Sequence, residues 1–421
     1  MKIDVMTKDK DTKTVVPALR FPEFSENGEW TIVPLKKHAK LITEKAKNRN
    51  YIPLSVTSGV GLVSQMEKFG REIAGEQYKN YYVINKFDFA YNKSATTSYP
   101  EGYISMLKNF DRGAVPNSIF TCFSVDKNEI NPQYLDQLFQ DNFHGKWLRN
   151  YIEIGSRANG ALSIDSKILL NMLIPLPKLK EQLKIKDCLS CLDDLISAVA
   201  DKIETLKEYK KGLMQQLFPA EGKTTPAFRF PEFQNAGEWK DTTLGEEVYY
   251  ENGKAHENDI NETGKYIVVN SKFISTDGEV VKYTDNPSCL ANKGDILMVL
   301  SDVPNGRAIA KCFIVDCNNK YTVNQRVCKL TPKKAVALLL YYSINRHPFL
   351  LAFDDGIKQT NLKKDDVLNC LFRLPQEPQE QQRIADCLLS VDELISTEIA
   401  KLDQLKAHKK GLMQQLFPKL Q

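Results

Sequence analysis

The run Asn131-Pro132-Gln133-Tyr134 sets an amide beside an aromatic ring, a pairing that can hold a reacting amine. It is similar to the Asn/Asp-Pro-Pro-aromatic motif with which amino-methyltransferases hold their target. The second proline of that motif is missing, and no Gly-x-Gly cofactor loop occurs between a strand and a helix. The run therefore favours a turn that begins a helix, and a DNA adenine methyltransferase with a degenerate motif stays as an alternative.

Other residues that could perform catalysis lack the spacing that catalysis needs. The five histidines offer neither a metal-ligand pattern nor a triad. Ser58-Gly59-Val60-Gly61 lacks the Lys-Ser/Thr of a phosphate-binding loop, and the run from Asp354 to Lys358 is interpreted as a turn rather than part of a nuclease. Cys188 and Cys191 have no second cysteine pair nearby, which argues against zinc. We predict no catalytic residues, no metal and no cofactor on this chain.

Three stretches carry the side chains that bind phosphates and base edges without making bonds. Residues 36–49 contain six basic residues against Glu44 alone, and residues 89–100 and 317–353 contain no acidic residue. For each stretch, a solvated surface is the alternative interpretation. Basic and amide residues in loops beside glycine add further candidates. The predicted DNA-binding residues are Thr57, Ser58, Asn92, Lys93, Ser94, Arg157, Ser271, Lys272, Asn305, Arg307, Lys320, Gln325, Arg326, Lys358 and Gln359.

Composition places these candidates in an ordinary globular chain. The 421 residues are 42% hydrophobic, enough for two to four domains that each bury a core. A net charge of +4 leans towards nucleic acid without settling the matter. The mixed Lys/Asp start predicts no signal peptide, and no apolar run of about 18 residues offers a membrane span. We expect a cytoplasmic protein with reduced cysteines and no membrane partner.

Two sets of landmarks divide the chain into halves. Residues 210–219 return unchanged as residues 409–418, each time at the end of a helical pattern. The opening Pro-Ala-Leu-Arg-Phe-Pro-Glu-Phe of residues 17–24, followed by Trp30, returns almost unchanged at residues 226–233, followed by Trp239. Repeats this far apart are whole domains rather than units of a solenoid.

Between the landmarks, the pattern predicts mixed globular regions. The first has strand-like runs at residues 51–56, 81–84 and 118–123 and helical runs at 132–143 and 167–172. The second has strand-like runs at residues 266–269, 279–283, 296–300 and 308–315 and a helical run at 335–345. Each region is about the size of one α/β or α+β domain.

A heptad pattern follows each globular region. Apolar residues at spacings of 3 and 4 run from Ile185 to Leu217, interrupted by Lys210, and again from Ile384 to Leu416, interrupted by Glu398 and Lys409. Each stripe predicts a helix roughly 60 Å long. Two such stripes in one chain are expected to pair.

These ordered landmarks resemble the specificity subunit of type I restriction-modification systems over nearly the whole chain. The residues that carry the resemblance are the Arg-Phe-Pro-Glu-Phe opening with its Trp, the Pro-then-Glu-Gln entry into each helix, and the Leu-Met-Gln-Gln-Leu-Phe-Pro end. It implies an α+β fold with two mixed α/β target recognition domains and two long helices in an antiparallel coiled coil, a pseudo-two-fold internal repeat. We divide the chain into a disordered tail (1–16), a first recognition domain (17–176), a central helix (177–219), a linker with the second recognition domain (220–375), and a C-terminal helix (376–421).

The resemblance also implies a function. Each recognition domain would read one half of a bipartite, asymmetric DNA target, the helices would set the spacer, and two modification subunits carrying S-adenosylmethionine would dock, with restriction subunits joining the complex. Segments repeated within one chain suggest that the same kind of partner binds at two equivalent places. A coiled-coil structural adaptor is a further alternative. The predicted partner-binding residues are Leu213, Met214, Leu217, Phe218, Leu412, Met413, Leu416 and Phe417.

Overall fold

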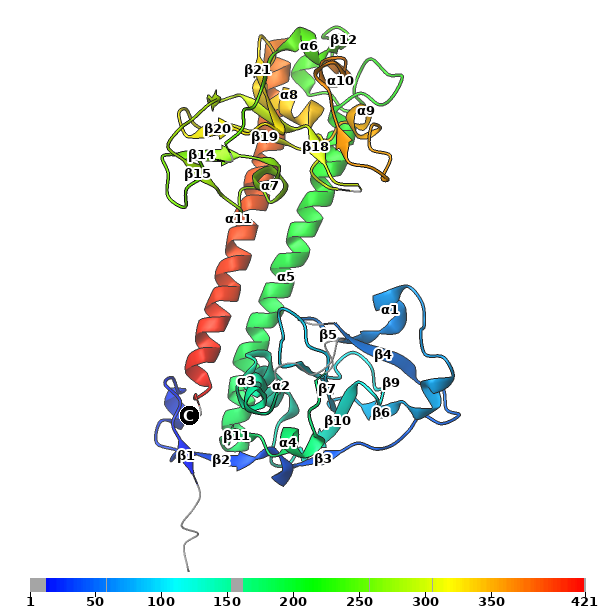
Figure 1. Ribbon diagram of the computed structural model, residues 1–421, viewed down its shortest axis with the longest axis vertical. Helices are drawn as coiled ribbons and strands as arrows, with labels where there is room; N and C mark the ends of the chain where they lie inside the picture. The colour runs from blue at the N-terminus through cyan, green and yellow to red at the C-terminus, as the bar shows by residue number, and fades with distance from the viewer. Residues whose placement is uncertain (1–12, 58, 153–161, 257, 305, 420–421) are drawn as a thin grey trace, which may run out of the picture. The chain divides into compact units, whose positions relative to one another are not determined.

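The computed structural model describes residues 13–57, 59–152, 162–256, 258–304 and 306–419 (Figure 1). The chain forms two compact units, one from residues 1–200 with 400–421 and the other from residues 201–399. We call them unit 1 and unit 2. Both boundaries fall inside the long helices α5 (Leu179–Leu217) and α11 (Pro378–Leu416). Each unit therefore contains one globular domain, one half of α5 and one half of α11.

Unit 1 contains three sheets among its described residues. The strand orders are β1-β2-β11, β3-β10-β7-β8 and β5-β4-β9-β6, and β4 pairs parallel with β9. The short helices are α1 (Gln65–Phe69), α2 (Pro132–Gln140), α3 (Phe143–Leu148) and α4 (Ser166–Leu170), with 3-10 turns at Pro22–Phe24, Leu35–Lys37, Glu76–Asn80 and Arg149–Tyr151. The strands are β1 (Thr14–Val15), β2 (Trp30–Pro34), β3 (Ala39–Leu41), β4 (Ile52–Thr57), β5 (Gly61–Ser64), β6 (Tyr82–Asn85), β7 (Phe89–Asn92), β8 (Tyr103–Met106), β9 (Arg112–Val115), β10 (Phe120–Val125) and β11 (Leu173–Leu176).

Unit 2 repeats this plan. Its strand orders are β12-β23, β13-β21-β17-β19, β15-β14-β20-β16 and β18-β22, and β14 pairs parallel with β20. The short helices are α6 (Leu244–Glu247), α7 (Ser271–Ser275), α8 (Ala337–Ile344), α9 (Pro348–Leu351) and α10 (Lys364–Leu368), with a 3-10 turn at Pro231–Phe233. The strands are β12 (Lys240–Thr243), β13 (Val248–Asn252), β14 (Tyr266–Val269), β15 (Tyr283–Thr284), β16 (Leu290–Ala291), β17 (Ile296–Val299), β18 (Ser301–Asp302), β19 (Cys312–Ile314), β20 (Tyr321–Val323), β21 (Val327–Pro332), β22 (Thr360–Asn361) and β23 (Leu371–Leu374).

The middle sheet of each unit is buried on both faces along a central strand, β7 in unit 1 and β17 in unit 2. In β17, Ile296 and Met298 join the core on the side of the long helices, whereas Leu297 and Val299 join the core beneath the sheet β15-β14-β20-β16. Successive side chains of a strand point to opposite faces, so four consecutive apolar residues fill two cores. Strand β7 of unit 1 alternates in the same way. The sheet that contains the parallel pair is consequently the outer layer of each unit, one sheet removed from the helices, and we call it the outer sheet.

The opening landmark of each half joins the globular domain to its helix. Arg20 donates to both carboxylate oxygens of Glu181, over 2.7 and 2.8 Å, and the indole of Trp30 donates to the same carboxylate over 3.1 Å. The backbone carbonyls of Asn27 and Gly28 accept the remaining guanidinium protons. Glu181 is only 1% exposed, and a buried carboxylate persists only when it is paired and hydrogen-bonded in this way.

Unit 2 builds the same joint from the repeated residues. Arg229 donates to both carboxylate oxygens of Glu380 over 2.7 Å each, and Trp239 lies 3.4 Å from that carboxylate. The next residue of each helix is also used alike, because the amide of Gln182 donates to the carbonyl of Pro177, as Gln381 donates to Pro375. The Glu-Gln pair at each helix entry is therefore a structural joint.

The lysines that interrupt the heptads pair the two helices. In unit 1 the ammonium of Lys409 lies 2.6 Å from Asp193, and in unit 2 that of Lys210 lies 2.6 Å from Asp392. A second pair in unit 2 joins Lys202 to Glu398. Partner numbers fall from 398 to 392 as the α5 numbers rise from 202 to 210, so the helices run antiparallel there, as predicted. A charged seam position fixes register, which apolar contacts alone specify weakly.

Three local expectations are wrong. Residues 279–282 form no strand, because the turn at Asp277 and Gly278, both with positive φ, leads the chain out of α7. Residues 308–311 form a turn, since the carboxylate of Asp302 accepts the N–H groups of residues 308 and 309. Thr14 and Val15, assigned to a disordered tail, form β1 and pair with β2.

Candidate nucleic-acid interface

The candidates of unit 1 gather at two neighbouring turns. Thr57 ends β4 at the hairpin to β5, and Asn92 ends β7, followed by Lys93 and Ser94. A Cβ placed on Gly59 in that hairpin would lie 3.8 Å from the hydroxyl of Tyr99, which brings the hairpin against the segment after β7. The side-chain oxygen of Asn92 accepts the N–H of Ser94 at 3.0 Å and so shapes the turn.

Lys93 lies between two polar hollows of unit 1. They measure about 440 and 320 Å³, and both are lined by Lys93, Ile164 and Asp165. The backbone of Lys93 is held on both sides, by the carbonyl of Ile119 and the N–H of Leu162. Asp165 uses one carboxylate oxygen to cap α4 through the N–H of Lys167. Hydroxyl groups contribute most of the remaining polar lining, namely those of Ser94, Ser118, Ser163, Thr43, Thr121 and Ser166.

The parallel pair in unit 2 sorts its candidates by edge. Strands β14 and β20 run in the same direction, so the residues that follow them lie at one edge of the outer sheet. Ser271 and Lys272 follow β14, and Gln325 and Arg326 follow β20. Lys320 precedes β20 and therefore lies at the opposite edge. At the edge where β14 and β20 end, the N–H of Asn324 donates to the carbonyl of Val269 and so joins the two strand ends. The hydroxyl oxygen of Ser271 is buried there without a hydrogen-bond partner among the described residues.

Two further candidate loops start beside this edge. Strands β18 and β22 pair antiparallel, with Ser301 opposite Asn361 and Asp302 opposite Thr360. Residues 303, 304, 306 and 307 on one side and residues 354–359 on the other extend from this pair, and we call these described residues the twin loops. They carry Arg307, Lys358 and Gln359. The carbonyl of Arg326 accepts the N–H of Leu300, the residue before β18, so the twin loops continue the surface that begins at α7.

The carboxylates near this surface are engaged by the protein itself. Asp302 accepts three backbone N–H groups, from residues 303, 308 and 309. Hydrogen bonds from the N–H groups of Ile357 and Lys358 lower the pKa of Asp355. Asp277 pairs with Lys311 at 2.7 Å. By contrast, Arg307, Arg326, Lys358 and Lys272 form no ion pair with another described residue, which leaves them available for phosphates.

Three predicted contacts, Ser58, Arg157 and Asn305, lie outside the described residues. Sequence reasoning also missed two groups. The Arg-Glu-Trp joints were quoted as landmarks, and their paired recurrence was the signal that could have revealed them. The second group is the exposed apolar residues of the twin loops, Val303 and Ile357, of which the sequence predicts only a turn at residues 354–358.

The run Asn131–Tyr134 is a helix start, as its sequence favours. The side-chain oxygen of Asn131 accepts the N–H groups of Gln133 and Tyr134 at 3.0 Å each, which caps α2. Tyr134 is fully buried and donates its hydroxyl to the carbonyl of Pro175. Neither side chain is therefore free to hold a target amine. Within the described residues, no group of three or more His, Cys, Asp or Glu side chains could hold a metal ion.

The predicted partner-binding residues are used mainly inside each unit. Leu416 and Phe417 are buried with Leu189 in unit 1, and Leu217 is buried with Trp239 in unit 2. Backbone bonds from Leu19 to Gln415 and from Phe228 to Gln216 hold the helix ends to the opening landmarks. Intramolecular packing thus accounts for the repetition that suggested a partner, and partner binding by these eight side chains stays a prediction. The others follow the same division, with Met413 buried and Leu213, Met214, Phe218 and Leu412 partly buried.

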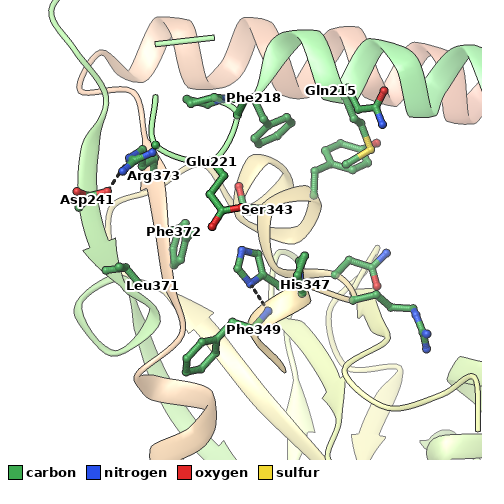
Figure 2. Close-up of a pocket in the computed structure, with 18 residues that line it drawn as sticks. Gln215, Phe218, Glu221, Asp241, Ser343, His347, Phe349, Leu371, Phe372 and Arg373 are labelled. Atoms are coloured by element: carbon green, nitrogen blue, oxygen red, sulfur yellow. Dashed lines mark hydrogen bonds and ion pairs between the residues drawn. The ribbon is translucent and has the colours of Figure 1, made fainter. Parts of the chain in front are cut away.

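A pocket of about 820 Å³ leaves part of this repeat accessible in unit 2 (Figure 2). Met214 and Phe218 line it from the end of α5, and Glu221 from the following linker points towards Ser343 of α8 (Figure 2). Burial lowers the pKa of His347 at the far wall, where its Nδ1 accepts the N–H of Phe349. An uncharged imidazole and several aromatic rings suit an apolar occupant better than a phosphate.

The family comparison matches both halves of the chain. A family model described as "Type I restriction modification DNA specificity domain" matches residues 28–208 and again residues 236–407. One relative, the type I restriction enzyme MjaVIII specificity subunit of Methanocaldococcus jannaschii, is 28% identical over 287 residues, covering 65% of this chain and 67% of the relative. None of the described helices is long and apolar enough to cross a membrane.

Solved structures share the fold. A crystal structure of a type I restriction-modification S subunit from M. genitalium matches with a TM-score of 0.61 and 16% identity, covering 97% of this chain and all of that chain. A chain from a study of complex assembly and conformational transition in a type I R-M system matches with a TM-score of 0.53 and 17% identity, covering 92% and 97%. The predicted α+β fold with two recognition domains is confirmed.

Proposed function

This chain belongs to the type I restriction-modification DNA specificity family, and from that membership we propose that each unit reads one part of a bipartite, asymmetric DNA target. The chain is a DNA-recognition component and not an enzyme, so the methyltransferase alternative is set aside. The supporting observation is that the units share one topology and the same Arg-Glu-Trp joint, yet carry different side chains at their strand ends. Unit 1 presents Lys93 after β7 of its middle sheet, and unit 2 presents Arg326 after β20 of its outer sheet. Two units that share the same joint but expose different side chains are suited to reading two different half-sites.

The helices in this proposal set the gap between the half-sites. Each helix supplies one half to each unit, and the ion pairs of Lys409 and Lys210 fix the register in unit 1 and unit 2 respectively. A spacer of defined register gives a defined gap, much as dimer geometry sets half-site spacing in other DNA-binding proteins. A structural adaptor without a DNA role would need no helix spacer of defined register.

Two modification subunits are the proposed partners, one for each unit, and they would carry S-adenosylmethionine and perform the methylation. Leu195 of unit 1 and Leu394 of unit 2 occupy equivalent positions in the repeat and are 42% and 56% exposed. Repeated leucines that remain at the surface suit a partner met twice better than the buried Leu217 and Leu416 do. The pocket beside Phe218 offers unit 2 a further docking surface. Restriction subunits would join this assembly.

The test is a domain exchange followed by methylation mapping. Residues 248–332, from β13 to β21, are replaced by the matching region of a relative, which leaves Trp239, α8 and both long helices intact. The chain is co-expressed with its modification subunits, and methylated adenines are located by sequencing. We expect one half-site to change while the other half-site and the gap persist.

The matched control exchanges residues 39–125 of unit 1, which should change the other half-site alone. A change in both half-sites after either exchange would contradict the assignment of one half-site to each unit.

A further inference from the structure

The twin loops expose two apolar side chains at their tips. Ile357 is 77% exposed, the highest value among the large hydrophobic side chains of the described residues, and Val303 is 64% exposed. Exposed apolar residues are common singly, but these two lie on neighbouring loops that leave the same β18–β22 pair. Because Val303 and Ile357 lie on neighbouring loops, one function for both side chains is the simplest explanation.

The loop of Ile357 is held in shape by its own side chains. One carboxylate oxygen of Asp355 accepts the N–H groups of Ile357 at 2.8 Å and Lys358 at 3.1 Å. Asp354 accepts from the N–H of Gly356 and the hydroxyl of Thr360. The amide of Gln359 donates to the hydroxyl of Ser301 at 2.8 Å and so ties this loop to β18. Ile357 is therefore presented by an ordered turn.

The loop of Val303 is equally constrained. Asp302 closes it by accepting three backbone N–H groups, and the N–H of Gly306 donates to the carbonyl of Val303. A Cβ on Gly306 would lie 2.1 Å from the carboxylate of Asp302, so only glycine fits there. A turn that is already ordered by its own hydrogen bonds loses less conformational entropy on binding.

Cations flank the apolar tips. Arg307 and Lys358 are exposed and form no ion pair with another described residue; Lys358 directly follows Ile357, and Arg307 lies four residues after Val303. Arg346 supports the first loop by donating to the carbonyl of Arg307 at 2.6 Å. Apolar tips beside cations match a polyanion with apolar stacked rings, which is the chemistry of DNA.

We propose that Val303 and Ile357 form a wedge that enters the DNA bound by unit 2 and presses against a base step, with Arg307 and Lys358 on the flanking phosphates. Apolar side chains inserted at a base step partly unstack it, and the cost is offset by the wider contact that results. Because easily unstacked steps yield at lower cost, the wedge adds sequence preference without hydrogen bonds to the bases. This inference rests on the proposed function of unit 2.

The test uses the complete assembly of this chain with its modification subunits, on a duplex whose target is known from methylation mapping. Base unstacking is read by permanganate oxidation of thymines in the half-site assigned to unit 2. We expect enhanced oxidation at one step, lost in Ile357→Ser, with DNA affinity weaker on the order of tenfold because one apolar side chain loses its burial. Lys358→Ala should retain the oxidation and lower the salt slope by about one unit.

Val280→Ser is the matched control, since Val280 is 39% exposed in unit 2 outside the twin loops and should change neither readout. Unchanged oxidation and affinity in Ile357→Ser would overturn the wedge. A loss of assembly with the modification subunits in that variant would also overturn it, because the tip would then bind protein. Failure of the proposed function is distinguishable, since exchange of residues 248–332 would then leave both half-sites unchanged.

Discussion

Replacing Glu181 by glutamine removes the charge that joins the opening of unit 1 to the start of α5. The carboxylate is 1% exposed and accepts two bonds from Arg20 and one from Trp30. Removing one partner of a buried ion pair costs roughly 3–5 kcal/mol, because the other charge stays buried without compensation. The Arg20 side chain is 11% exposed and keeps two backbone carbonyl acceptors, so we take the lower end, about 3 kcal/mol.

This loss should be visible as a shift in melting temperature. For a body of about 150–250 residues, 1 kcal/mol corresponds to roughly 2–4 °C, so unit 1 should melt about 6–12 °C lower. Differential scanning calorimetry of the whole chain measures the shift, and the fluorescence of Trp30 reports on the joint itself. Glu380→Gln should lower the transition of unit 2 by a similar amount.

Glu23→Gln is the matched control. Glu23 pairs with Lys184 on the same helix at 2.9 Å, but both side chains are about half exposed. Solvent screens an exposed pair, so this variant should melt close to the parent. If Glu181→Gln shifts the transition no more than Glu23→Gln does, the buried joint does not stabilise unit 1 as argued.

Three further outcomes are expected. Burial lowers the pKa of His144 to about 4, so the folded imidazole stays neutral while the unfolded one takes up a proton. The free energy of unfolding of unit 1, measured in urea, should therefore fall by up to about 3 kcal/mol as pH drops from about 6.5 towards 4, and His144→Gln should remove that dependence. Arg326→Ala should lower the salt slope of DNA binding by about one unit, whereas Lys320→Ala, at the opposite edge of the outer sheet, should leave it unchanged. Inserting one heptad after both Ala200 and Ile399 lengthens each helix by about 10 Å and should widen the mapped methylation gap by roughly three base pairs. Insertion in one helix alone should destabilise the protein. An unchanged gap in a stable double insertion would show that helix length does not set the spacing between the half-sites.

The sequence by itself determined the two-part plan and the long helices. Hydrophobic periodicity is a local property, so the stripes from Ile185 and Ile384 predicted α5 and α11 nearly to their ends. The unchanged residues 210–219 and 409–418 likewise predicted two equivalent helix ends. Most strand-like runs became strands for the same reason, since β-branched and aromatic residues favour a pleated, half-buried surface.

Only the tertiary structure decided what the repeated residues contact. The sequence around Glu181 does not show whether its carboxylate is a buried acceptor for Arg20 and Trp30 or a charge on the surface. In the same way, the residues next to the buried Leu416 would suit a leucine on a docking face equally well. Strand direction decided the candidate site in the same way. The parallel pairing of β14 with β20 places Arg326 at the same edge of the outer sheet as Lys272. Lys320 lies at the opposite edge, although it is close to Arg326 in the chain. Such pairings depend on packing between residues far apart in sequence, which periodicity does not encode.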